Sequence, residues 1–189
     1  KKTLMASSSE YVEQKLKGFS QTEEKIKYDV LVSSDQDGAY YEQFVKKYTC
    51  ALAHKKQLQS EETIYFAFRE KTESSHWTAA VLQLKRKSPK PFIFDSIRHL
   101  SQTAVVSLSQ LMGKYGGSIY TCCSGLQYDD DSCKLFTLDF LFEMAKMSKG
   151  HAIFTYLVRA KQNNPSRTAD GITKIETTDL PWRLVRNAQ

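Results

Sequence analysis

The sequence predicts one α+β domain, in which a buried helix opening at Cys133 packs on a small mixed sheet that carries His76 and Asp95. Three stretches between residues 64 and 96 alternate in polarity or are short and apolar, as strands are. The helix at 134–147 is apolar on nearly every side, which indicates a central position. A chain of 189 residues with 41% hydrophobic content can bury one core and is short for two, so we expect residues 1–189 to form a single domain.

Residues 1–60 are expected to be a mainly helical region that supports the core or recognises a substrate. Ser8 or Ser9 can cap a helix through about Lys17, and apolar residues recur at helical spacing between residues 39 and 57. Between these helices, the short apolar run at 28–32 is typical of an edge strand.

Residues 61–150 form the predicted catalytic core. It begins with three strands joined by short loops, near residues 64–69, 76–84 and 92–96, which together predict an antiparallel meander.

The second half of this core leads to Cys133. A helix at 101–115 ends at the glycine pair 116–117 and is followed by a strand at 118–123. The polar loop 124–131 then delivers Cys133 to the start of the buried helix.

Residues 151–189 are predicted to be a C-terminal packing segment. It consists of a helix at 151–161, a polar loop at 163–171 and an apolar run at 180–185. We expect that apolar run to pack back on the core.

We expect a monomer, and the cysteine content favours a reducing compartment. Four cysteines are few for a disulfide-held fold, and without a Cys-x-x-C pair or clustered histidines we expect no metal site. Because the basic residues behind the net charge of +6 are spread along the chain, nucleic acid is not an expected partner; an acidic protein or an anionic regulator stays open. No signal peptide is visible, and no apolar run reaches the roughly 18 to 20 residues of a membrane span.

Cys133 is the candidate nucleophile. A thiol reacts as thiolate, and a helix N-terminus and a neighbouring histidine both favour that ionised form. A buried core thiol is the alternative, but the polar residues 128–132 before Cys133 indicate a helix start, with Asp131 or Ser132 as cap.

His76 is the candidate base and Asp95 its orienting carboxylate. His76 opens one predicted strand and Asp95 ends the next, 19 positions later, so adjacent strand ends can bring the two side chains together. Gln127, six positions before Cys133, can supply an N–H group to an oxyanion. A surface histidine and an ordinary loop glutamine are the alternatives.

These motifs, in this order and spacing, resemble the CE clan of cysteine proteases. They are His76-Trp77-Thr78, 92–96, Gln127 and Asp131-Ser132-Cys133. The clan contains the ubiquitin-like-protein proteases and related bacterial effectors, among them the YopJ-type acetyltransferases. The resemblance covers roughly residues 64–147 and implies a papain-like, Ulp-type fold.

The resemblance also implies roles for single residues. His76, Asp95 and Cys133 would be the triad, Gln127 the oxyanion residue, and Trp77 a wall of the channel that admits a Gly-Gly tail, unless Trp77 is a core aromatic.

Three functions remain open. The first is a cofactor-free cysteine isopeptidase that removes ubiquitin, SUMO or NEDD8 from target proteins through a thioester. The second is a YopJ-type acetyltransferase that moves acetyl from acetyl-CoA through Cys133 to Ser, Thr or Lys of a host protein, with inositol hexakisphosphate in a basic pocket. The short spacing from Asp95 to Cys133 and the segment 180–189 are similar to this branch. The third is a binding module with a decayed site, because Lys134 stands where the family usually has glycine. On family grounds, we expect a secreted bacterial effector that acts in the host cytoplasm.

Overall fold

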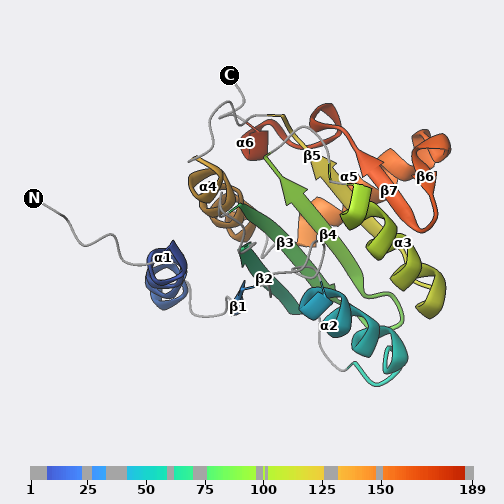
Figure 1. Ribbon diagram of the computed structural model, residues 1–189, viewed down its shortest axis with the longest axis horizontal. Helices are drawn as coiled ribbons and strands as arrows, with labels where there is room; N and C mark the ends of the chain where they lie inside the picture. Colours follow the sequence, from blue (N-terminus) through green and yellow to red (C-terminus); the bar gives the residue numbers. More distant parts are fainter. Residues whose placement is uncertain are drawn as a thin grey trace, which may run out of the picture.

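The chain folds around a seven-stranded mixed sheet with helices on both faces (Figure 1). The computed structural model describes residues 8–22, 27–32, 42–58, 62–69, 76–96, 100, 102–125, 132–147 and 151–185. In chain order, its elements are α1 (Ser8–Thr22), β1 (Lys27–Val32), α2 (Glu42–Ala53), β2 (Glu62–Arg69), β3 (Trp77–Leu84), β4 (Lys90–Asp95), α3 (Gln102–Tyr115), β5 (Ile119–Cys123), α4 (Cys133–Lys146), α5 (His151–Asn163), η3 (Pro165–Arg167), β6 (Thr168–Ala169), β7 (Ile172–Ile175), η4 (Thr177–Asp179) and α6 (Trp182–Val185).

The strand order β1-β2-β3-β4-β5-β7-β6 combines parallel and antiparallel pairs. Strands β2, β3 and β4 form the predicted antiparallel meander. Strands β1, β5 and β7 extend it in parallel with their neighbours β2, β4 and β5. The prediction of an α+β fold with a mixed sheet is therefore confirmed, and the sheet is larger than expected.

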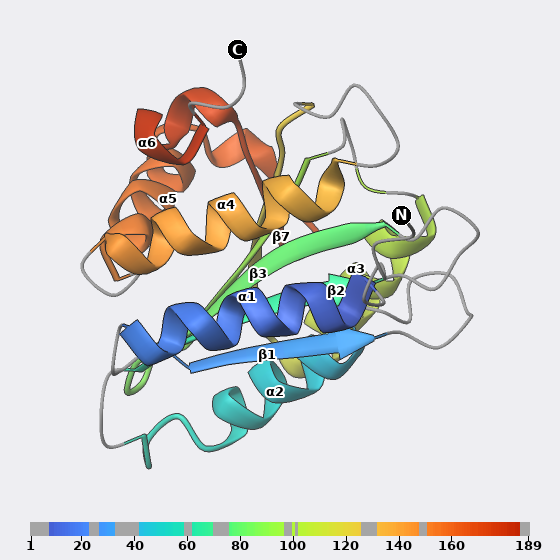
Figure 2. The same cartoon turned by 90° about the vertical axis from the view of Figure 1, so that its left-hand side faces the viewer.

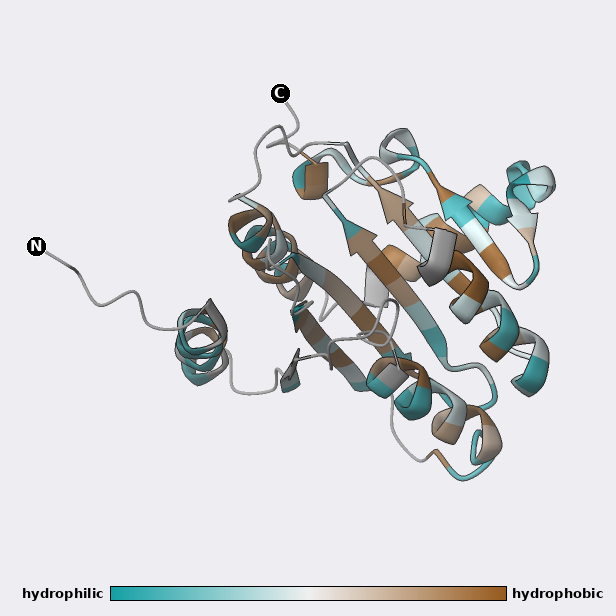
Figure 3. Cartoon of the chain, in the orientation of Figure 1, coloured by the Kyte–Doolittle hydropathy of each residue, from teal (hydrophilic) through white to brown (hydrophobic). Residues whose placement is uncertain are grey.

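Each face of the sheet buries its own hydrophobic core, because successive side chains of a strand point to opposite sides. In β3, Trp77, Ala79 and Val81 face α1, α4 and α5, whereas Ala80 and Leu82 face α2 and α3. Figure 2 shows α1 and α4 together on one side of the sheet, with α2 on the other. In Figure 3 hydrophobic residues fill the middle of the sheet, and hydrophilic ones gather on the outer helix surfaces.

Helix α4 lies against the middle of the sheet, as its apolar sequence predicts. The ring of Phe140 stacks on Phe94 of β4 with centroids 4.0 Å apart and planes inclined by 3°. Leu135 is the exception to this burial, because 56% of its surface is exposed.

Two sequence predictions need correction. Helix α1 runs to Thr22 rather than ending near Lys17. The stretch 163–171, predicted to be a loop, contains a 3-10 turn and β6, and its end turns directly into β7. The turn between β6 and β7 uses positive φ at Asp170 and Gly171, and β7 pairs with β5 for only four residues, too few for a periodic signal.

The apolar run near the C-terminus packs on the core as predicted. Leu184 and Val185 of α6 are buried, and the Arg183 guanidinium Nε donates to the buried Glu143 carboxylate of α4. Among the described helices, none is both long and apolar enough to cross a membrane.

Candidate active site

Four chain segments meet where β4 and β5 end. Because β3 runs antiparallel to β4, with Ala79 opposite Phe94, the start of β3 lies beside the end of β4. Strand β5 runs parallel to β4 and ends beside it, with Cys123 paired to Asp95. Helix α4 starts with Cys133, which belongs to the core on the α1 and α4 side.

Asp95 is fully buried and uses both carboxylate oxygens. His76 Nε2 lies 2.8 Å from Oδ1, and the Thr78 hydroxyl donates to Oδ2 over 2.9 Å. The Ser124 amide donates to the Asp95 carbonyl over 2.9 Å, which fixes the strand end. A buried carboxylate with these partners is held in one orientation, with its charge directed at the imidazole.

His76 connects this carboxylate to the thiol of Cys133. Burial lowers the pKa of His76, but hydrogen bonds and charge attraction with Asp95 and Cys133 outweigh it and raise the pKa to about 10. At neutral pH His76 is therefore an imidazolium. Since Nε2 is bonded to Asp95, Nδ1 is the ring nitrogen left for the hydrogen bond with Cys133.

Cys133 occupies the first position of α4 and is 2% exposed. The positive end of the helix dipole and the imidazolium of His76 both stabilise a negative sulfur there. The structure thus brings Cys133, His76 and Asp95 into one chain of contacts, the geometry expected of a nucleophile, its base and an orienting carboxylate.

The predicted cap of this helix is only partly testable. Ser132 makes no side-chain capping hydrogen bond, so that alternative is wrong; its carbonyl accepts the amides of Leu135 and Phe136. Asp131 lies outside the described residues, as does Gln127, whose oxyanion role stays a prediction.

The sequence alone left the roles of the Trp77 and Lys134 side chains open. Trp77 is 1% exposed and lies in the same core as Cys133, which favours the core aromatic over a channel wall. The Lys134 ammonium lies 4.7 Å from the ring centroid of Tyr11 in α1, so its side chain is directed to that helix.

Sequence reasoning missed Thr78, which completes the bonding of the Asp95 carboxylate. Its signal was available: side chains two positions apart on a strand share a face, so Thr78 accompanies the residue at 76.

Described residues line two of the cavities near the sheet. One, of about 530 Å³, is lined by Cys123, Thr121 and Lys174 on the α3 side, the opposite face from Cys133. Burial, together with the charge of Asp95, raises the pKa of Cys123 to about 12, so this thiol is protonated at neutral pH.

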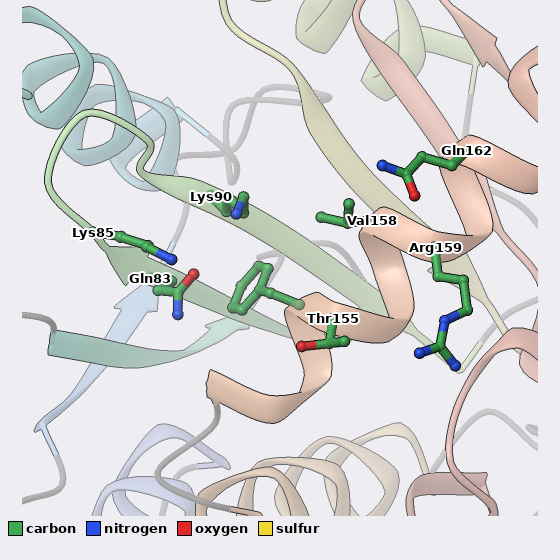
Figure 4. A pocket seen from close by; sticks show the side chains of 8 residues that line it. Gln83, Lys85, Lys90, Thr155, Val158, Arg159 and Gln162 are labelled. Atoms are coloured by element: carbon green, nitrogen blue, oxygen red, sulfur yellow. The ribbon is translucent and has the colours of Figure 1, made fainter.

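The other cavity, of about 380 Å³, lies at the far end of β3 and β4 (Figure 4). Gln83, Lys85 and Lys90 border it from the sheet, and Thr155, Arg159 and Gln162 border it from α5. We call it the basic cavity. Because the seven steps along β3 from Trp77 to Leu84 cover roughly 3.3 Å each, it lies about 20 Å from the triad.

No group of three or more His, Cys, Asp or Glu in the described part of the chain is placed to hold a metal ion.

The fold and the Cys, His and Asp contacts define the class: a CE-clan-like fold that holds a thiol, an imidazole and a carboxylate together. The family model of the YopJ serine/threonine acetyltransferases matches residues 20–189, and the chain belongs to this family. The resemblance to the CE clan is thereby confirmed.

Solved structures agree in fold. AvrA delL154 with IP6 and CoA has a TM-score of 0.62 at 10% identity, covering 98% of this chain and 68% of its own. HopZ1a in complex with IP6 has a TM-score of 0.61 at 11% identity, covering 97% of this chain and 66% of its own. The chain thus spans about two thirds of the length of these proteins. No curated protein sequence matches it.

Proposed function

We propose that this chain is a cysteine acetyltransferase, in which Cys133 takes acetyl from acetyl-CoA and passes it to a Ser, Thr or Lys side chain of a protein. The observation that carries the proposal is the imidazolium of His76, held between the buried carboxylate of Asp95 and the thiol of Cys133. The family match favours this activity over the isopeptidase that we expected first.

The first half of the reaction loads the thiol. The Cys133 thiolate attacks the thioester carbonyl of acetyl-CoA, and the carbon–sulfur bond to CoA breaks as the new thioester forms. His76 donates its Nδ1 proton to the departing CoA thiolate, so the products are CoA thiol, acetyl-Cys133 and neutral imidazole.

The second half transfers the acetyl group. The acceptor, a Ser or Thr hydroxyl or a neutral Lys amine, attacks the acetyl carbonyl while neutral His76 accepts its proton. Cys133 leaves as thiolate. The charge and hydrogen bond of Cys133 help to raise the pKa of His76, and both are lost in the thioester. Acetylation of Cys133 therefore lowers the pKa of His76 and favours the neutral imidazole that this half of the reaction starts from. Asp95 orients the ring throughout. Gln127 is proposed as an oxyanion donor.

An anionic regulator is proposed as well, because the AvrA and HopZ1a structures contain IP6. The basic cavity offers Lys85, Lys90 and Arg159, cations of the kind that hold phosphate groups. Three cations are few for a hexakisphosphate, so we expect weak binding from this cavity alone.

The site of action is proposed to be a host cytoplasm, which a secreted bacterial effector would reach. All four cysteines are free in the structure, and a reducing compartment would keep them as thiols.

The test compares two chemistries on the same thiol. The protein is incubated with acetyl-CoA, with and without IP6, and CoA release is measured; in parallel it is exposed to electrophilic probes built on ubiquitin, SUMO and NEDD8. We expect CoA release that is lost in Cys133→Ala and retained in Cys50→Ala, the matched change at an exposed cysteine. A probe adduct on Cys133 without CoA release would contradict the proposal and favour the isopeptidase.

A further inference from the structure

The first turn of α4 carries the nucleophile but receives no capping hydrogen bond from the Ser132 side chain. The first amide groups of a helix have no partner within the helix, so a helix start can fray. A frayed first turn would carry Cys133 away from His76. Contacts of this turn with a neighbouring element would therefore keep Cys133 beside His76.

Helix α1 lies alongside α4 and supplies such contacts. The Lys134 ammonium lies 4.7 Å from the Tyr11 ring centroid, and the rings of Phe19 and Phe142 lie 4.8 Å apart. The partners are eight positions apart on each helix, since 19 − 11 = 8 and 142 − 134 = 8. Equal spacing in the same order means that the two helices run parallel for two turns, as Figure 2 shows.

The contact nearer the nucleophile is a cation–π interaction at the residue directly after Cys133. Tyr11 is partly buried and packs against the core that contains Val12, Leu16 and Cys133. The ammonium of Lys134 is attracted to this ring. This contact accommodates the side chain of Lys134 directly after the nucleophile.

We infer that Tyr11 and Lys134 are positioning residues, which hold the first turn of α4 on α1 so that the Cys133 thiol stays in contact with His76. The inference rests on Cys133 being the nucleophile, as in the proposed function, but it does not depend on the acyl donor. Lys134 acts through the ring of Tyr11 and not by its charge on the sulfur.

The experiment measures the rate of Cys133 alkylation by iodoacetamide in the full chain, read by peptide mapping from about pH 5 to about pH 9. Because Cys133 is 2% exposed, iodoacetamide reaches its thiol through the opened turn, so Tyr11→Leu and Lys134→Met should each speed the reaction about threefold, the size expected for a cation–π contact. The gain should persist across this pH range, because it comes from access to the thiol and not from its ionisation. The double variant should be no faster than either single variant, because both remove one interaction.

Three variants serve as matched controls. Tyr11→Phe and Lys134→Arg keep a ring and a cation and should retain the rate. Lys15→Met removes another ammonium near the same ring, 5.6 Å from its centroid, but from within α1, so it should have no effect.

Hydrogen exchange tests positioning directly. In Tyr11→Leu, the amides of the first turn of α4 should exchange faster while those near Phe142 keep their rates. A slower rate in Lys134→Met but not in Tyr11→Leu would overturn the inference in favour of a direct charge effect, and so would unchanged exchange in the first turn. If these variants behave as expected but acetyl-CoA never reacts, the inference stands and the proposed function fails.

Discussion

Replacing Asp95 by asparagine should lower the pKa of His76 without removing a side chain from the site. The carboxylate lies 2.8 Å from the ring and is fully buried, so little solvent screens its charge. An opposite charge this close shifts a pKa by roughly 1 to 3. We therefore expect the pKa of His76 to fall from about 10 to about 7.5, a loss of about 3 kcal/mol of preference for the imidazolium.

The assay is an NMR titration of the His76 ring, whose signal is identified by its absence in His76→Asn. At pH 9 about 90% of the wild-type rings should be protonated, against about 3% in Asp95→Asn. Thr78→Val is the control, because it removes the other hydrogen bond to Asp95 but leaves the charge, and should change the pKa far less. An Asp95→Asn protein whose His76 still titrates near 10 would refute the reasoning.

Three stability predictions follow from the fold. Because the folded-state pKa of His76 is raised to about 10, the contribution of its protonated ring to the free energy of unfolding is complete below about pH 6.5 and is lost as pH rises through about 10. Urea unfolding measured across this pH range should show the loss, and a smaller loss in Asp95→Asn. Phe140→Ala should lower the free energy of unfolding by about 3 to 5 kcal/mol, whereas Leu135→Ala, at a side chain that is 56% exposed, should change it by less than about 0.5. Gly171→Ala should lower the free energy of unfolding by about 3 kcal/mol and Gly116→Ala by about 1 kcal/mol. Both glycines have a positive φ, but only at Gly171 would an added Cβ come within 2.6 Å of an α3 side chain. Equal melting temperatures for the two glycine variants would contradict this.

The arrangement of His76, Asp95 and Cys133 could be predicted from the sequence because it depends on local topology. Short loops join the meander strands, so His76 before one strand and Asp95 at the end of the next fall at the same edge. The polar loop before Cys133 marked a helix start in the same way, since caps and dipoles act over a single turn.

Other features depend on partners far apart in the chain. Tyr11 and Lys134 are 134 − 11 = 123 positions apart, and no periodicity shows that α1 would lie on α4. Trp77 can be a core side chain or a channel wall with the same neighbours in sequence, and its burial in the core with α4 residues, which favours the first, depends on tertiary packing.

The most direct test of the central claim is to look for acetyl on Cys133 itself. The protein is mixed with labelled acetyl-CoA and IP6, quenched in acid to preserve a thioester, and mapped by peptide mass spectrometry, beside a His76→Asn variant with an unchanged melting temperature. The account predicts one labelled acetyl group on Cys133 in the wild type and none in the variant. Label confined to other residues, or equal labelling of Cys133 in both proteins, would contradict it.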